Sequence, residues 1–165
     1  MPDASAADLR AAVAHATPGL LALPDPHRRP APDAWSPAET LGHLVDSATV
    51  NYGRVVRGVA GGPLVFGGYD QDAWVAAGRY ADADWPALVA LWQALNEQLA
   101  RVVGGIPGDV LDRPQLRHSL HRTAWRPVPA RQAATLRYVV DDYTGHLRHH
   151  LAIIDPALAG AAEGA

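Results

Sequence analysis

The sequence contains no cysteine, and this absence limits its chemistry at once. Disulfide bonds, thiolate metal ligands and a cysteine nucleophile are all excluded. Any metal ion that the chain binds must therefore be held by histidine and carboxylate side chains. The absence of cysteine also fits a reducing compartment.

Long apolar runs and an excess of basic residues are missing as well. No apolar run reaches the roughly 18 residues that a membrane span requires, and residues 1–10 lack the basic segment and apolar core of a signal peptide. We therefore expect no membrane partner and a cytoplasmic location. The formal net charge is −3, and the scattered arginines, Arg54 and Arg57 among them, are predicted to lie on a solvated surface. Nucleic acid is not an expected partner.

Apolar residues at helical spacing are what the sequence does contain. Of its 165 residues 48% are hydrophobic and 19% charged, which is typical of one globular domain. Four amphipathic stretches span about residues 5–16, 37–57, 84–104 and 130–154. No alternation typical of strands is sustained. Because the connections are long, we predict an all-α fold, a four-helix bundle with crossover connections over residues 1–155, and a frayed tail at 156–165.

The second stretch has the clearest start. Ser36 is predicted to cap it, Pro37 suits the first helical position, and Glu39 completes a capping box. Asp70 is predicted to cap a short helix at 71–77. The inner faces of the second and third helices are predicted to contain Leu41, Leu44, Val45, Ala48, Tyr52 and Val55, and Leu88, Leu91, Trp92, Leu95, Leu99 and Val102.

The other helix ends carry weaker signals. Ser5 and Asp8 resemble a capping box for the first helix, and Pro18 is expected to end it or to start a short second one. The third helix is predicted to be capped by Asp84 or Asp82. The long segment 105–129 is expected to fold over one end of the bundle.

Two histidines fall within the apolar stripe of the last helix. His146 and His150 are four residues apart, so their imidazoles can point toward one place. His43, on the predicted second helix, is placed to supply a third nitrogen. A histidine that binds a metal usually donates its other N–H to a carboxylate or carbonyl. Asp46 and Asp142, three residues after His43 and four before His146, are the expected partners.

A histidine on an apolar face is more often a satisfied core residue than a ligand, and that alternative stays open. Two imidazoles left unpaired inside a bundle cost several kcal/mol, however, whereas a metal ion satisfies both. A second pair, His118 and His121, is three residues apart in the long connection, and we interpret it as a surface pair.

Three segments together resemble the DinB-like superfamily, including its YfiT-type metal-dependent enzymes. They are WSPAETLGHLVDS at 35–47, YDQDAW at 69–74 and GHLRHHLAII at 145–154, and the similarity extends over nearly the whole chain. The Trp-Ser-x-x-Glu helix start that leads to a histidine, followed by a final His-x-x-x-His, is specific in this order and spacing.

The resemblance implies a four-helix bundle in which three histidines hold a divalent metal at one end. Transferred residue by residue, the metal ligands are His43, His146 and His150, while His149 is expected to be exposed or to support them. The segment from Tyr69 to Trp74 is expected to pack beside the metal, with Tyr69 or Asp70 orienting substrate and Trp74 anchoring the loop.

Three nitrogen ligands leave a coordination position for water or substrate, which is typical of a catalytic metal site. We expect zinc first, with nickel, copper, manganese or iron also suited to imidazole ligands. The ion would activate water or a small thiol, as in the superfamily's thiol-dependent transferases and isomerases, or in a hydrolase. The substrate is expected to be a small molecule, and a low-molecular-weight thiol a partner; no catalytic residue is assigned.

The alternative is a metal-stabilised bundle without catalysis that acts as a dimeric stress-response or interaction module. The first helix has an alanine-rich face on which a second copy could pack, so a homodimer is one option and the oligomeric state stays open. That face contains Ala6, Ala7, Ala11 and Ala14.

Overall fold

The computed structural model describes residues 3–160, and helices account for nearly all of its regular structure. The four long helices are α1 (Ala4–Leu21), α2 (Pro37–Val59), α4 (Trp85–Gly104) and α7 (Leu136–Ile154). The short elements are α3 (Gln71–Gly78), α5 (Gly108–Leu111), α6 (Leu120–Thr123) and the 3-10 turns η1 (Tyr80–Asp82) and η2 (Pro156–Leu158). Within the described range the only β pairing consists of two isolated bridges. The all-α prediction is therefore confirmed.

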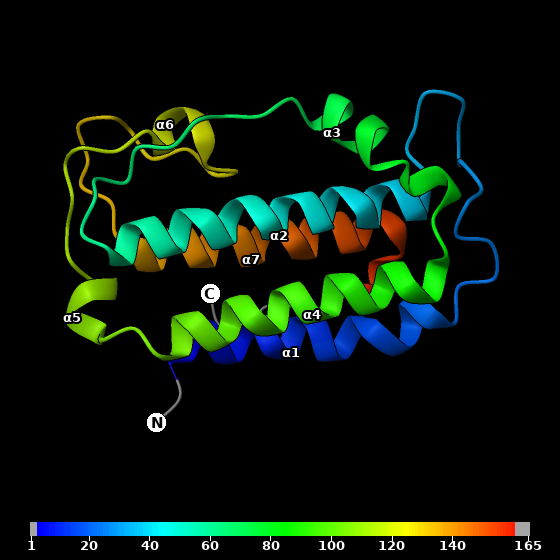
Figure 1. Cartoon of the computed structure of the whole chain (residues 1–165), viewed down its shortest axis with the longest axis horizontal. Helices are drawn as coiled ribbons and strands as arrows, with labels where there is room; N and C mark the ends of the chain where they lie inside the picture. Colours follow the sequence, from blue (N-terminus) through cyan, green and yellow to red (C-terminus); the bar gives the residue numbers. More distant parts are fainter. Residues whose placement is uncertain (1–2, 161–165) are drawn as a thin grey trace.

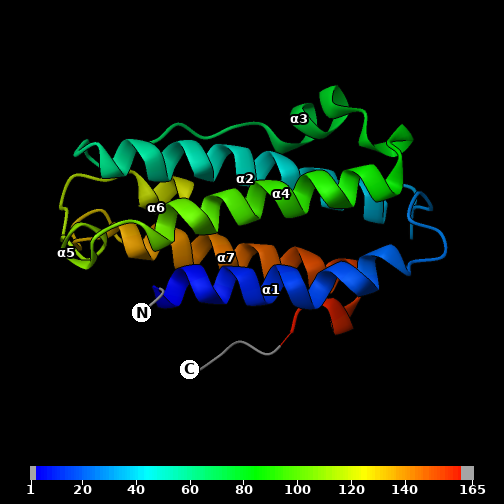
Figure 2. The same ribbon diagram turned by 60° about the horizontal axis from the view of Figure 1, so that its bottom comes forward.

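The four long helices form a four-helix bundle with crossovers. Helix α4 packs on α1 and α2, and α7 packs on α2 and α1, so consecutive helices α1 and α2 lie diagonally. Figures 1 and 2 show that α1 and α7 run one way along the bundle while α2 and α4 run the other. Because α2 and α4 are parallel neighbours, the connection 60–84 returns along the whole bundle and carries α3.

The core fills the space between the four helices. Trp92 is completely buried, and Leu41, Leu44, Leu99 and Leu147 are 1% exposed or less. These residues come from α2, α4 and α7, at the helical spacing that the sequence shows. Two residues of the predicted inner faces lie outside the core instead, because Leu91 is 47% and Tyr52 37% exposed. Both stand at the edge of an apolar stripe.

The start of α2 matches its predicted capping box. The Ser36 hydroxyl accepts the Glu39 N–H at 3.2 Å, and the Glu39 carboxylate accepts the Ser36 N–H at 2.9 Å. Arg29 forms an ion pair with Glu39 from the loop before the helix. Both side chains of the box are buried, so the first turn of α2 is held rigidly. Asp70 caps α3 and Asp84 caps α4, as the sequence predicts.

The boundaries of α1 differ from the prediction. Asp3 caps the helix through the N–H groups of Ser5 and Ala6, whereas Asp8 forms an ion pair with Arg148 of α7. The helix also continues through Pro18 to Leu21. Leu20 is completely buried and its carbonyl accepts the Trp85 indole N–H at 2.8 Å, so tertiary contacts stabilise the turn that proline weakens.

Helix α7 begins at Leu136, six residues later than predicted. The backbone of Ala134 exchanges two hydrogen bonds with Gln115, which holds residues before the helix in an extended conformation. Thr135 then caps the helix by accepting the Tyr138 N–H at 3.1 Å.

The segment that follows α7 is packed at its beginning. Pro156–Leu158 forms the turn η2, and Leu158 is 4% exposed against α1, where the sequence led us to expect a frayed tail. Residues 161–165 of that tail lie outside the described residues. Among the described helices, none combines the length and apolar character needed to cross a membrane.

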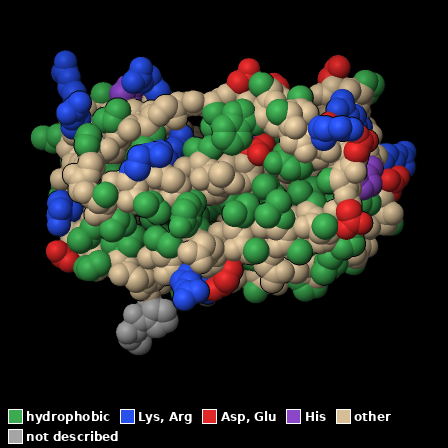
Figure 3. Space-filling view, in the orientation of Figure 1, with side chains coloured by type: hydrophobic (Ala, Val, Ile, Leu, Met, Phe, Trp, Pro, Cys, Tyr) green, Lys and Arg blue, Asp and Glu red, His purple; other side chains and the backbone are tan. Residues whose placement is uncertain are grey.

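One face of the bundle is largely apolar. Hydrophobic side chains spread over α2 and α4 in Figure 3, while charged ones gather toward the edges of the view. Val56 and Val59, both more than 40% exposed, line a shallow groove here with Ile106. On the alanine-rich side of α1, Ala6 belongs to the core, whereas Ala7, Ala11 and Ala14 are exposed.

Candidate metal centre

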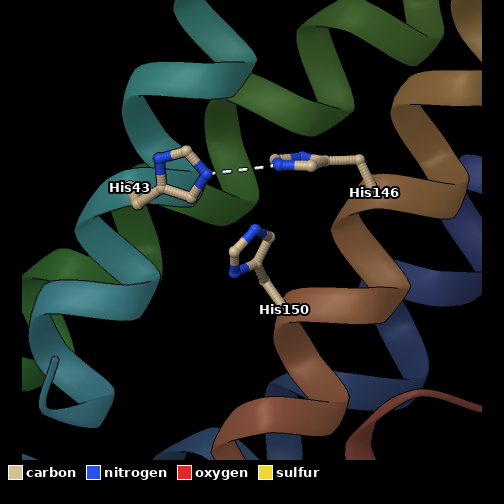
Figure 4. A group of neighbouring side chains, drawn as sticks. All are labelled: His43, His146 and His150. Atoms are coloured by element: carbon tan, nitrogen blue, oxygen red, sulfur yellow. Dashed lines mark hydrogen bonds between the residues drawn. The ribbon is translucent and has the colours of Figure 1, made fainter. Parts of the chain in front are cut away.

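Three imidazoles from two helices meet at one place inside the bundle. His43 comes from α2, and His146 and His150 come from successive turns of α7 (Figure 4). The Nε2 atoms of His43 and His146 lie 3.2 Å apart, and one nitrogen of each of the three rings lies within 4.8 Å of the others. Among the described residues this is the one cluster of three side chains with metal-ligating spacing.

The geometry of this triad of histidines suits a metal ion. Two nitrogens each about 2.0–2.1 Å from a tetrahedral ion lie roughly 3.3 Å apart, close to the 3.2 Å between His43 and His146. His43 directs its Nε2 at His146, so Nε2 is the His43 atom placed to bind an ion. The buried Nδ1 atoms of His43 and His150 have no hydrogen-bond partner, and a cation bound at Nε2 would leave the Nδ1 of His43 as a hydrogen-bond donor.

The electrostatics keep the three rings neutral. Burial lowers the pKa of His43 to about 4 and that of His150 to about 4. Burial, reinforced by the two neighbouring imidazoles, lowers the pKa of His146 to about 3. Neutral imidazole is the form that binds metal, so near pH 7 all three nitrogens are available without loss of a proton.

The two carboxylates expected beside the histidines have other partners. Asp46 accepts the Tyr80 hydroxyl at 2.6 Å, and Asp142 accepts the backbone N–H groups of Trp125 and Arg126 at 2.8 and 2.7 Å. The expectation that they orient the imidazoles is therefore wrong. Each carboxylate instead holds a connection against a long helix. Tyr80 lies in the connection between α2 and α4, and Trp125 lies in the connection between α4 and α7.

Other side chains position the imidazoles. The Ser47 hydroxyl, one turn after His43, lies 3.4 Å from His146 Nδ1. The Trp35 ring, just before the capping box, packs with its centroid 5.2 Å from that of His43. Tyr69 stacks on His43 at 6.5 Å. The Trp-Ser-x-x-Glu segment thus both starts α2 and packs against its histidine.

The segment around α3 contributes less than expected. Asp70 uses its carboxylate to cap α3 by accepting the Ala73 N–H at 3.0 Å. Trp74 is 40% exposed and packs on Tyr69 with ring centroids 5.0 Å apart, in keeping with an anchor for the loop. Tyr69 is the residue of this segment that stacks on the triad.

A pocket of about 350 Å³ opens beside the triad. Residues of α2 and α7 line it together with parts of the connection between α2 and α4 and of the connection between α4 and α7. The lining residues are Ser47, Asn51, Arg54, Gly68, Tyr69, Gln71, Arg122, Thr123, Ala124, Trp125, Asp142, Tyr143, His146, His149 and His150. This volume suits a small molecule, and the lining is rich in polar groups.

Two residues line the pocket although the sequence did not predict them there. Arg54, predicted to be solvated, is only 7% exposed and lines the pocket. Its position could have been predicted from helical spacing, because Ser47, Asn51 and Arg54 follow His43 on one face of α2. Trp125 is another pocket residue that the sequence analysis did not single out; its ring packs on His146 and on the exposed His149.

The second histidine pair has a structural role. His118 is 8% exposed, so its prediction as a surface residue is wrong. Its Nε2 donates to the Gln132 carbonyl at 2.7 Å, and its Nδ1 accepts the Leu120 N–H at 3.1 Å. Both ring nitrogens of His118 are therefore used in holding the connection between α4 and α7 together. The His121 ring lies 6.3 Å away, and the pair has no third metal-ligating partner among the described residues.

Comparison with known proteins agrees with this architecture. The chain is similar to the structure of YfiT from Bacillus subtilis, described as a probable metal-dependent hydrolase with an unusual four-helix bundle topology. The identity is 19% and the TM-score 0.72, over 93% of this chain and 83% of that one. No protein of curated function matches the sequence. The sequence pattern of the DinB superfamily matches residues 3–154. This chain belongs to the DinB superfamily.

Proposed function

We propose that His43, His146 and His150 bind one divalent metal ion and that the protein is a metal-dependent enzyme acting on a small molecule in the adjoining pocket. The observation that carries this proposal is the convergence of three neutral imidazoles, two of which line a polar pocket. Zinc is the ion we propose first, because its preferred ligands include imidazole and its preferred distances fit the triad.

Three nitrogen ligands would leave a bound ion with an open coordination position, and this favours catalysis over a purely structural role. A divalent ion held by these nitrogens would lower the pKa of a water molecule or a small thiol toward neutrality, which supplies a nucleophile for attack on an electrophilic substrate. The chain has no cysteine, so any thiol must come from outside. The likeness to YfiT, itself described as a probable metal-dependent hydrolase, supports water as the nucleophile.

The protein's own residues have distinct tasks in this proposal. The three rings hold the ion, Ser47 orients His146, and Trp35 holds His43 against α2. The walls from the two connections restrict access of bulk water and select the substrate. The thiol-transfer alternative uses the same ion and the same pocket.

Metal content tests the first half of the proposal. The purified protein is expected to contain about one transition-metal ion per chain. His146→Ala removes a nitrogen from the site and is expected to reduce the content to less than a tenth. His27→Ala, at an exposed position outside the site, is the matched control and should leave it unchanged. Equal metal content in the wild type and His146→Ala would overturn the assignment of the site.

Turnover tests the second half. Metal-loaded protein is assayed for hydrolysis of activated esters and amides, and separately for conjugation of a small thiol to an electrophile. Activity that is lost in His43→Ala and kept in His27→Ala supports catalysis at the triad. Full metal occupancy without turnover in either assay would instead support the non-catalytic, metal-stabilised bundle.

A further inference from the structure

Arg54 is a buried cation without a paired anion. Its side chain is 7% exposed, and none of the ion pairs among the described residues includes it. The nearby Asp142 directs both carboxylate oxygens to backbone N–H groups. Burying an unpaired guanidinium is unfavourable by several kcal/mol. A fold that keeps such a charge at a pocket suggests that the missing anion is a ligand.

The guanidinium also keeps unused hydrogen-bond donors. Nη1 donates to Asn51 Oδ1 at 3.4 Å and to the Thr123 carbonyl at 3.3 Å, and Nη2 donates to the Gly67 carbonyl at 3.3 Å. These three bonds are long and their acceptors are uncharged. An arginine has five N–H groups, so two are left over here. One is on Nη2, and the other is on Nε, which is buried and has no partner. The Phe66 ring lies 5.4 Å from Cζ and supports one face.

Arg54 and two histidines of the triad, His146 and His150, line one pocket. His43, Ser47, Asn51 and Arg54 follow one another along the same face of α2, and the last three line the pocket. Eleven residues of helix separate the Cα atoms of His43 and Arg54 by about 16 Å. His146 and His150 line the same pocket as Arg54, so a molecule that contacts Arg54 at one end can lie against these two histidines at the other.

The charge of the pocket favours an anion. Its charged lining residues are Arg54, Arg122 and Asp142, so the lining is cationic although the whole chain carries −3. The three imidazoles, being neutral, add nothing, and a divalent metal ion at the triad would make the pocket more positive. A local potential opposite in sign to the net charge attracts anionic ligands selectively.

We propose that Arg54 binds a carboxylate of the substrate, which is therefore a small organic anion whose reactive group reaches the triad. This inference rests on the proposed function for the reaction, while the carboxylate site itself does not need the metal. The spare N–H on Nη2 can donate to a carboxylate oxygen, and the charge of the guanidinium favours that anion over a neutral group of the same shape. Phosphate makes the same kind of contact with arginine, so the test includes it as a competitor.

The test compares an acid with its neutral isostere. The full chain, as purified and after chelation, is titrated with 3-phenylpropanoate and with 3-phenylpropanamide, and binding is followed by calorimetry and by melting temperature. We expect the acid to bind at least tenfold more tightly than the amide, with or without metal. Equal affinity for both, or binding of neither, would overturn the inference.

Variants then locate the site. Arg54→Gln is expected to weaken binding of the acid at least tenfold, whereas Arg54→Lys, which keeps the charge but not the planar donors, should lie between. Arg57→Gln is the matched control, because Arg57 is an exposed cation on the same helix, outside the pocket, and also stacks on Phe66. A folded Arg54→Gln protein that binds the acid like the wild type would show that Arg54 only ties Gly67 and Thr123 to α2.

Two further measurements, competition by inorganic phosphate and metal content, distinguish the ways in which the proposals can fail. If inorganic phosphate competes as well as the acid, the site is a general anion site and the carboxylate assignment is wrong. If the protein binds the acid but no metal, the proposed function fails while the carboxylate site stands. If it binds metal but shows no preference for the acid, only this inference fails.

Discussion

Acid should destabilise the metal-free protein through the triad alone, before any carboxyl group in an ordinary environment titrates. An unfolded histidine has a pKa near 6.5, whereas burial lowers the folded values to about 4 for His43, about 3 for His146 and about 4 for His150. Between pH 6.5 and 4 the unfolded chain therefore binds more protons than the folded one. Stability is complete above pH 6.5 and is lost as the pH falls toward 4.

The magnitude follows from these pKa values. From pH 7 to pH 5 each of the three histidines lowers the free energy of unfolding by about 2 kcal/mol, or about 6 kcal/mol together. A domain of this size has a total stability of roughly 5–15 kcal/mol. The effect is therefore large enough to unfold a marginal protein, and it is readily measured.

Urea unfolding in the presence of a chelator at pH 5, 6 and 7 measures this loss. His43→Gln removes one titrating group and should reduce the loss by about 2 kcal/mol. His27→Gln, at an exposed position, serves as the control and should show the wild-type loss. If the wild type and His43→Gln lose the same free energy between pH 7 and pH 5, the imidazoles are not held neutral by burial and the reasoning fails.

Three substitutions test how the site and the helices around it are supported. Gly42→Ala would place a Cβ 2.1 Å from the Tyr80 ring, so it should destabilise the fold by about 1–3 kcal/mol in thermal unfolding. Gly53→Ala, whose Cβ would meet nothing closer than 3.4 Å, should instead stabilise it by roughly 0.5–1 kcal/mol; a matching loss in both variants would refute the steric argument. Tyr143→Phe leaves the completely buried Asn96 without its 2.5 Å partner and should cost about 1–3 kcal/mol, and a neutral result would mean that water replaces the hydroxyl.

Local signals predicted the parts of the fold that depend on local physics. The capping box of Ser36 and Glu39 involves side chains three residues apart, and the structure contains both of its hydrogen bonds. His146 and His150 are four residues apart on a helix, a spacing that brings their rings together whatever surrounds them. His43 shares the inner face of α2 with Leu44, so its burial also follows from helical periodicity.

Long-range contacts determine what the sequence did not reveal. Helix α1 passes through Pro18 because Trp85, far along the chain, donates to the carbonyl of Leu20. Arginine is usually solvated, and the burial of Arg54 depends on two connections, through Gly67 and Thr123, that cover α2. Spacing along a helix placed Asp142 beside His146, but it cannot predict a partner from another segment. In the structure Asp142 accepts the backbone N–H groups of Trp125 and Arg126 instead.

The division of the triad between α2 and α7 also has a consequence for folding kinetics. His43 and His146 are 103 residues apart in the chain, so the complete three-nitrogen site forms only after the second and last helices have docked. An ion held there stabilises the native state more than earlier, partly folded states, and interactions absent from the transition state slow unfolding rather than accelerate folding. Metal supply would then set the lifetime of the folded chain, and a chelator would shorten it without changing the refolding rate.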